Sequence, residues 1–139
     1  MKVSFDFDDT LSRPSIQRYA KELIATGAEV WIVTTRWDAR SKLCSKDYYD
    51  THGDTWTEVN KKALELGIPL KRVIFTCYQW KVTFFEKNLD FLWHLDDNGS
   101  EFKTIRALGI SVVDSYHPKW KITCNKLIKD RGTVDAQRG

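Results

Sequence analysis

Three aspartates, Asp6, Asp8 and Asp9, stand near the start of the chain, directly after a short apolar-alternating run over residues 2–5. The run predicts a buried strand, so the carboxylates come where that strand ends. Like charges that repel one another and lose hydration are tolerated mainly where a cation lies among them. The pattern indicates a metal-assisted active site, with a solvated acidic turn as the alternative.

Partner groups for these carboxylates occur at the ends of three later apolar runs. Thr34 follows the run at 29–33, Lys81 lies in the first turn after the run at 72–76, and Asp96 and Asp97 follow the run at 91–95. In phosphoryl transfer, donors and positive charge bind the phosphoryl oxygens, and a divalent cation screens an anionic nucleophile from an anionic phosphate. The set of side chains therefore suits phosphoryl transfer.

Glycines and apolar periodicity predict the elements that must position these groups. Gly27, Gly67 and Gly109 each end a helical pattern and precede an apolar, β-branched run. Strands are expected over 2–5, 29–33, 72–76, 91–95 and 110–113, and helices over 16–24, 55–66, 79–87, 100–108 and 119–129. This alternation predicts an α/β fold with a mostly parallel sheet of about five strands, covered on both faces. Ligands of such sheets bind beyond the carboxyl ends of the strands.

Length and composition bound the class of protein. The 139 residues fit one domain, expected over residues 1–130 and followed by a polar tail over 131–139. With 42% hydrophobic and 29% charged residues, the chain is typical of globular rather than disordered or fibrous proteins. The net charge of +3 favours anionic ligands but is too small for a dedicated DNA binder.

The termini and cysteines indicate a compartment. The sequence has no signal-peptide pattern and no apolar run near the ~20 residues that span a bilayer, so we expect a cytoplasmic protein without a membrane partner. Three widely spaced cysteines, Cys44, Cys77 and Cys124, suggest neither a disulfide framework nor a zinc site. Reduced thiols are expected, with Cys77 and Cys124 as small buried hydrophobes.

One long segment, residues 36–56, lacks clear periodicity and combines aromatic with basic side chains. Long loops in compact domains are usually functional or mobile. Stacking and cationic groups would suit a nucleotide or a polynucleotide end. A packed structural loop is an equal alternative, and a short helix over 38–46 is a further option.

The motifs together resemble the haloacid dehalogenase superfamily of phosphatases. The resemblance covers residues 2 to about 115, and its motifs are Asp-Phe-Asp-Asp-Thr at 6–10, Val-Thr-Thr-Arg at 33–36, Lys81, and His-Leu-Asp-Asp-Asn at 94–98. It implies a Rossmann-like three-layer sandwich. Receiver domains of phosphorelays share the ingredients, but their lysine comes after the hydroxyl with the phosphorylated Asp on a middle strand, so the order here disfavours them.

The resemblance also implies a role for each residue. Asp6 would be the nucleophile that forms an aspartyl-phosphate, and Asp8 the general acid and base. Thr34 and Lys81 would hold the phosphoryl oxygens. Thr10, expected to steady Asp8, is grouped with Thr35 and Arg36 at the substrate. Mg²⁺ would be held by Asp6, the backbone carbonyl of Asp8, Asp96 and Asp97.

Several choices stay open at this level. Lys87 competes with Lys81 as the phosphate-binding lysine, and Thr35 with Thr34. Asp9 stands where the family most often has glycine, and it has no chemical task. Since no large insertion follows the first or second motif, no sizeable cap domain is expected.

An open site would accept a phosphorylated small molecule or a macromolecular end. Nucleic acid and oligomerisation remain options. The alternatives to a Mg²⁺-dependent phosphomonoesterase are a nucleotide- or nucleic-acid-end-binding protein and a non-hydrolytic phosphoryl acceptor.

Overall fold

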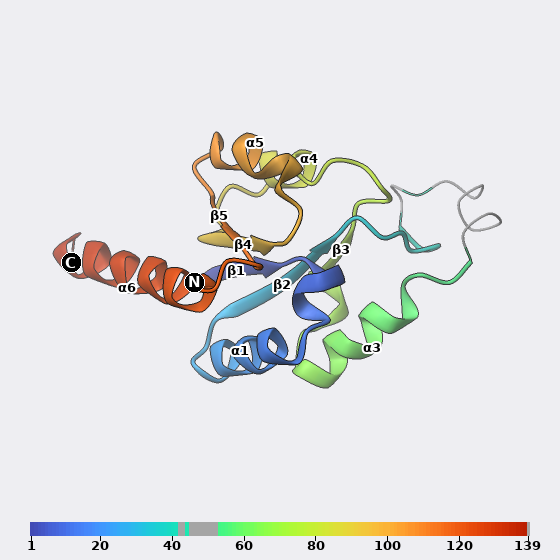
Figure 1. Ribbon diagram of the computed structural model, residues 1–139, viewed down its shortest axis with the longest axis horizontal. Helices are drawn as coiled ribbons and strands as arrows, with labels where there is room; N and C mark the ends of the chain where they lie inside the picture. Colours follow the sequence, from blue (N-terminus) through green and yellow to red (C-terminus); the bar gives the residue numbers. More distant parts are fainter. Residues whose placement is uncertain (42–43, 45–52, 139) are drawn as a thin grey trace.

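The computed structural model describes residues 1–41, 44 and 53–138. Five strands form one all-parallel sheet in the order β3-β2-β1-β4-β5, with helices on both faces (Figure 1). The strands are β1 (Lys2–Phe5), β2 (Glu29–Thr34), β3 (Val73–Phe75), β4 (Trp93–Asp96) and β5 (Ser111–Asp114). The α-helices are α1 (Pro14–Ala25), α3 (Thr57–Leu66), α4 (Val82–Glu86), α5 (Phe102–Arg106) and α6 (Trp120–Arg138). The predicted α/β fold with a five-stranded parallel sheet is confirmed.

Two apolar cores make this a three-layer sandwich. The larger core joins one face of the sheet to α1, α3 and α6, and the smaller one joins the other face to α4 and α5. Phe5 and Trp93 lie in the first core, whereas Val33 and Phe85 lie in the second. Strands covered on both faces read as nearly continuous apolar runs, which is why the sequence predicted them well.

Most element boundaries lie within one or two residues of the sequence-based expectation, and three larger differences remain. Helix α4 begins at Val82 rather than at residue 79, because Cys77 and Tyr78 adopt positive φ and extend the preceding loop. Helix α6 continues to Arg138, so residues 131–138 are helical rather than a loose tail. Residues 38–41 contain a turn instead of the start of a helix, and most of the remaining part of that expected helix lies outside the described residues.

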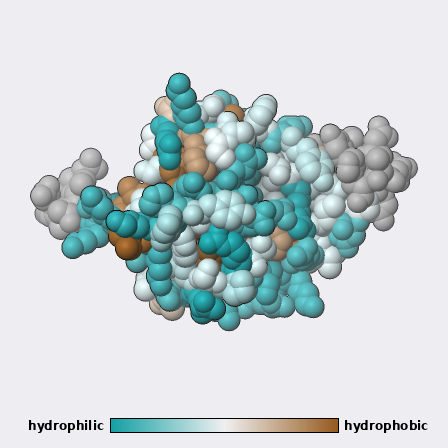
Figure 2. Space-filling view, viewed as in Figure 1, coloured by the Kyte–Doolittle hydropathy of each residue, from teal (hydrophilic) through white to brown (hydrophobic). Residues whose placement is uncertain are grey.

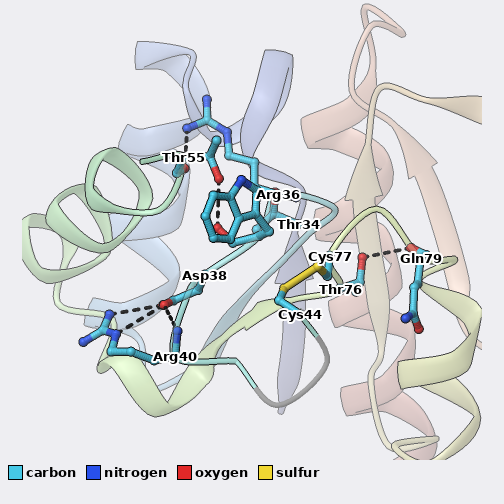
Figure 3. The surroundings of a disulfide bond; sticks show 10 residues. Thr34, Arg36, Asp38, Arg40, Cys44, Thr55, Thr76, Cys77 and Gln79 are labelled. Carbon is cyan, nitrogen blue, oxygen red and sulfur yellow. Dashed lines mark hydrogen bonds and ion pairs between the residues drawn. A yellow bond between two sulfur atoms is a disulfide. The ribbon is translucent and has the colours of Figure 1, made fainter. Parts of the chain in front are cut away.

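Cys44 and Cys77 form a disulfide that the sequence analysis did not expect (Figure 3). The expectation of reduced thiols is therefore wrong for this pair. Their Cα atoms lie 5.4 Å apart, within the range that a disulfide spans. The bond joins the segment after β2 to the loop after β3, whereas Cys124 is a buried free thiol in the larger core.

The described residues form no separate cap domain, since the segments between β1 and β2 and between β2 and β3 contain one α-helix each. Hydrophilic and intermediate residues cover most of the face seen in Figure 2, and the hydrophobic residues there form small separate patches. Among the described residues, no helix combines the length and apolarity needed to cross a membrane.

Candidate active site

The site lies at the carboxyl ends of β1 and β4, where the strand order reverses. From β1 the chain continues outward through β2 and β3, and it then returns to the other side of β1 as β4. Phe5 and Leu95 are paired in register, and the amide of Asp6 donates to the carbonyl of Leu95 at 2.8 Å. Asp6 and Asp96 therefore leave neighbouring strands at the same level, in the crevice where open α/β sheets bind ligands.

Lys81 bridges these two carboxylates. Its ammonium donates to Oδ1 of Asp6 at 2.8 Å and to Oδ2 of Asp96 at 2.7 Å. All three side chains are nearly inaccessible to solvent, and Lys81 is only 3% exposed. A buried lysine is stable only when its charge is paired, so this triad is one electrostatic unit.

The protonation of the triad depends on burial and on the lysine. Burial raises the pKa of Asp6 to about 8, although Lys81 opposes the shift. Burial would also raise the pKa of Asp96, but the hydrogen bonds from His94 and Lys81 and the positive charge of Lys81 outweigh it and hold this pKa well below its usual range. The pKa of Lys81 is lowered by burial and raised by the two aspartates, with a net rise. Asp96 is thus the more anionic of the two carboxyl groups.

A buried polar chain behind Asp96 fixes its orientation. Nε2 of His94 lies 2.9 Å from Oδ2 of Asp96, and Nδ1 of His94 lies 2.8 Å from the hydroxyl of Ser4. Burial lowers the pKa of His94, so the ring is neutral. Because an ionised carboxylate only accepts hydrogen bonds, the ring donates from Nε2 and accepts from Ser4. The amide of Asn98 donates to the other oxygen, Oδ1, at 3.1 Å.

Asp97 completes a candidate metal site. One carboxylate oxygen each from Asp6, Asp96 and Asp97 lies within 4.8 Å of the others, a grouping that could hold a cation. Thr10 supports Asp97, since its hydroxyl donates to Oδ1 at 3.4 Å and lies 3.0 Å from the hydroxyl of Ser115. The expected contact of Thr10 with Asp8 is therefore wrong. Thr10 is fully buried, which also contradicts its grouping with the substrate-binding residues.

Asp8 lines the same cavity as Asp6 and pairs with Arg36. The guanidinium of Arg36 donates to both carboxylate oxygens, at 2.6 and 2.9 Å, and also to Glu58 and to the carbonyl of Thr55. Arg36, expected at the substrate, is thus committed to orienting Asp8. The carboxylate of Asp8 remains 53% exposed, so a ligand can reach it. Its side chain is not part of the metal grouping, which leaves its backbone carbonyl as the ligand expected from the sequence.

The structure separates the two threonines after β2. Thr34 is fully buried, and its hydroxyl accepts a hydrogen bond from the amide of Arg36 at 3.2 Å. Thr35 is partly exposed and lines the cavity beside Asp6. The assignment of Thr34 to the phosphoryl oxygens therefore disagrees with the structure, in which Thr34 shapes the turn and Thr35 faces the cavity.

The two candidate lysines are also separated. Lys81 lines the cavity of about 140 Å³ that contains Asp6, Asp8 and Asp96, whereas Lys87 lines a different hollow on α4. Glu101 holds the backbone at Lys81, because its carboxylate accepts from the amides of Lys81 and Val82, both at 3.0 Å. This contact fixes the start of α4 beside the site.

Asp9 has a conformational role in the turn after β1. Its φ of 53° and ψ of 15° lie in the left-handed region, where glycine is favoured. The turn that carries Asp6 and Asp8 past the strand end therefore needs the conformation that glycine usually supplies. Asp is among the residues that tolerate it.

Sequence reasoning missed Glu101, Ser115 and the positioning role of Arg36. Ser115 could have been found, because it directly follows β5 and so belongs to the same edge of the sheet. Nothing in the sequence indicated that Arg36 would turn to Asp8 or that Glu101 would cap α4.

Comparisons with known proteins support only the fold. No protein-family model and no curated protein matches the chain. An uncharacterized protein from Corynebacterium glutamicum superposes with a TM-score of 0.60 at 11% identity, covering 91% of this chain and 93% of that one. A hypothetical protein from Xanthomonas campestris gives a TM-score of 0.48 at 15% identity, and the match covers 84% of this chain and 65% of that one.

Proposed function

We propose that this chain is a Mg²⁺-dependent phosphomonoester hydrolase of the haloacid dehalogenase type, with Asp6 as the nucleophile. The observation that carries the proposal is the Asp6–Lys81–Asp96 triad at the switch point of the sheet. A buried structural ion pair needs one carboxylate for one ammonium. Here a second and a third carboxylate converge on the same point, which is the arrangement needed for a cation and an anionic substrate together.

The residues present fit a magnesium ion. Asp6, Asp96 and Asp97 offer carboxylate oxygens, the ligand type that Mg²⁺ prefers, and the small number of protein ligands suits an ion that retains waters. Two of these carboxylates already share a cation, the ammonium of Lys81. When bound, Mg²⁺ would screen the negative charges of Asp6 and of the phosphate from each other.

Asp6 attacks the phosphorus of the substrate. The bond from its carboxylate oxygen to phosphorus forms as the bond from phosphorus to the leaving oxygen breaks, and water later hydrolyses the aspartyl-phosphate. The ammonium of Lys81 lies within hydrogen-bond distance of Asp6, so it can also donate a hydrogen bond to a phosphoryl oxygen of a substrate bound at Asp6. The hydroxyl of Thr35, which lines the cavity, is a further hydrogen-bond donor.

Asp8 moves the protons. It protonates the leaving oxygen in the first step and accepts a proton from water in the second. The bidentate pair with Arg36 orients the carboxylate for both steps.

The substrate is expected to be a phosphorylated small molecule or a macromolecular end, because no cap domain covers the cavity among the described residues. The cytoplasmic location stays a prediction. The Cys44–Cys77 disulfide is more typical of an oxidising compartment.

Hydrolysis of p-nitrophenyl phosphate tests the proposal. The wild-type protein should release phosphate with Mg²⁺ and lose this activity in EDTA. Asp6→Asn should reduce kcat at least about 10³-fold, because the amide is a poor nucleophile. Asp114→Asn is a matched control, since Asp114 ends β5 at the same sheet edge but is exposed and bonds only locally to the amide of Tyr116. Equal activity of the wild-type and Asp6→Asn proteins would refute the mechanism.

Two alternatives predict no hydrolysis of the ester, and further measurements separate them. Binding of phosphorylated nucleic-acid ends without hydrolysis, with a steep salt dependence, would indicate a binding protein. A stable phosphorylated Asp6 without turnover would indicate a phosphoryl acceptor.

A further inference from the structure

The loop between β3 and α4 presents an exposed indole next to the candidate active site. Trp80 is 64% exposed and directly precedes Lys81, whose ammonium contacts Asp6. Trp80 therefore belongs to the loop that carries Lys81 into the site. An indole that is both exposed and adjacent to a site can supply an aromatic surface for a ligand.

The backbone on both sides of Trp80 is firmly held. On the preceding side, the amides of Thr76, Cys77 and Tyr78 donate to carbonyls of residues 34–36 at 2.7 to 3.1 Å. The hydroxyl of Thr76 also donates to the carbonyl of Gln79 at 2.9 Å (Figure 3). On the following side, Glu101 accepts from the amides of Lys81 and Val82. A stacking residue on such a loop is preorganised and loses little entropy on binding.

A hollow beside Trp80 adjoins the active-site cavity. Trp80, Val82, Ser100, Glu101 and Thr104 line a space of about 210 Å³. Ser100 and Glu101 also line the cavity that contains Asp6, so the two spaces share a wall. The hollow thus offers an aromatic surface and two hydroxyls to any group attached to a phosphate at Asp6, whereas the carboxylate of Glu101 is engaged with the amides of Lys81 and Val82.

We propose that Trp80 is the stacking platform for the nucleobase of a phosphorylated nucleoside whose phosphoryl group lies at Asp6. The inference rests on the proposed function for the position of the phosphate, and it specifies the substrate class. A planar ring fits because aromatic stacking needs a π-face, and the hydroxyls of Ser100 and Thr104, which line the hollow, can contact the edge of a base. The nucleoside can be a free mononucleotide or the end of a polynucleotide.

Calorimetry tests the inference independently of hydrolysis. The Asp6→Asn protein, which is not expected to turn over its ligand, is titrated with adenosine 5′-monophosphate and with ribose 5-phosphate, in the presence of Mg²⁺. The nucleotide should bind more tightly. Adding Trp80→Ala should raise the Kd of the nucleotide about 5- to 150-fold, as expected for the loss of one stacked base, and leave ribose 5-phosphate unchanged. Trp80→Phe should retain part of the difference in affinity between the nucleotide and ribose 5-phosphate.

Leu89→Ala is the matched control, because Leu89 is similarly exposed at 59% but lies in the loop after α4 and lines none of these hollows. A 5′-phosphorylated single-stranded oligonucleotide is titrated alongside, and a Trp80-dependent affinity above that of the mononucleotide identifies a polynucleotide end. Equal affinity for the nucleotide and ribose 5-phosphate, no nucleotide binding, or an unchanged Kd in Trp80→Ala would overturn the inference. If the protein hydrolyses p-nitrophenyl phosphate but gives one of these three binding results, only the inference about Trp80 is overturned. If nucleotide binding depends on Trp80 but no ester is hydrolysed, only the proposed function is overturned.

Discussion

The ammonium of Lys81 lies 2.8 Å from Oδ1 of Asp6, although 75 positions separate the two residues in the chain. The parallel sheet explains the contact. Asp6 directly follows β1 at the centre of the sheet, and Lys81 precedes α4, which packs on one face and is anchored there by Glu101. The contact places a buried positive charge beside the proposed nucleophile, and the predictions below depend on it.

Lys81→Met should lose both activity and stability. The substitution leaves Asp6 and Asp96 buried without their shared cation, and breaking a buried ion pair on one side costs about 3–5 kcal/mol. Urea unfolding of the metal-free protein measures this change. Lys87→Met is the matched control and should stay within about 0.5 kcal/mol of the wild type, because Lys87 is exposed outside the site. Similar losses in the two variants would show that the triad does not have the role assigned to it.

The stability of the metal-free protein should depend on the protonation of Asp6. Its pKa is raised from 3.8 to about 8 by burial in the folded state, so the folded state binds a proton that the unfolded state has released. The stabilisation of the folded state by this bound proton is fully present below pH 4. It falls by at most about 1.4 kcal/mol per pH unit as pH rises, and it is lost above pH 8. Asp6→Asn should remove this slope and be the more stable protein at pH 8. Parallel pH profiles for the two proteins, measured by urea unfolding, would exclude a raised pKa at Asp6.

His94 should set the affinity of the metal site. His94→Leu would remove the hydrogen bond that orients Asp96, and the loss of such a supporting group typically weakens metal binding about 10- to 100-fold. Titration with Mn²⁺ followed by electron paramagnetic resonance measures the Kd directly, without turnover. Ser4→Ala should have a smaller effect, because it leaves the His94–Asp96 contact in place. An unchanged Kd in His94→Leu would show that Asp96 needs no such support.

The turn at Asp9 should tolerate glycine and reject valine. Asp9 is exposed and left-handed, so Asp9→Gly should change the free energy of unfolding by less than about 1 kcal/mol. Asp9→Val should cost about 1–3 kcal/mol, because β-branched residues are strained in this conformation. Thermal unfolding of both variants distinguishes a conformational role from a chemical one. A loss of activity in Asp9→Gly with unchanged stability would instead give Asp9 a chemical task.

Much of this site could be predicted because parallel strands gather their carboxyl ends at one edge. Asp6 and Asp96 follow strongly apolar runs, so their strands were recognisable and their meeting point followed from topology. Lys81 could be placed near the carboxyl ends of the strands, because it follows β3 by only a few residues. The α/β sheet was therefore recoverable from the pattern of apolar residues alone.

The directions of side chains could not be predicted. Thr34 and Thr35 are adjacent, and only the three-dimensional turn decides that Thr34 is buried and Thr35 faces the cavity. Arg36 could equally have pointed at a substrate, but Asp8 and Glu58 compete successfully for its guanidinium. The Cys44–Cys77 bond depends on two loops meeting, which sequence spacing does not encode.

Chemical trapping of the intermediate tests the central claim most directly. Protein mixed with Mg²⁺ and a phosphate ester is quenched during turnover with borohydride, which reduces an acyl phosphate to an alcohol and so converts a phosphorylated aspartate to homoserine. Peptide mass spectrometry then locates the change. The account predicts homoserine at position 6, at no other aspartate, and only when the ester is present. Turnover of the ester with Asp6 unmodified, or homoserine at Asp8 or Asp96 instead, would contradict it.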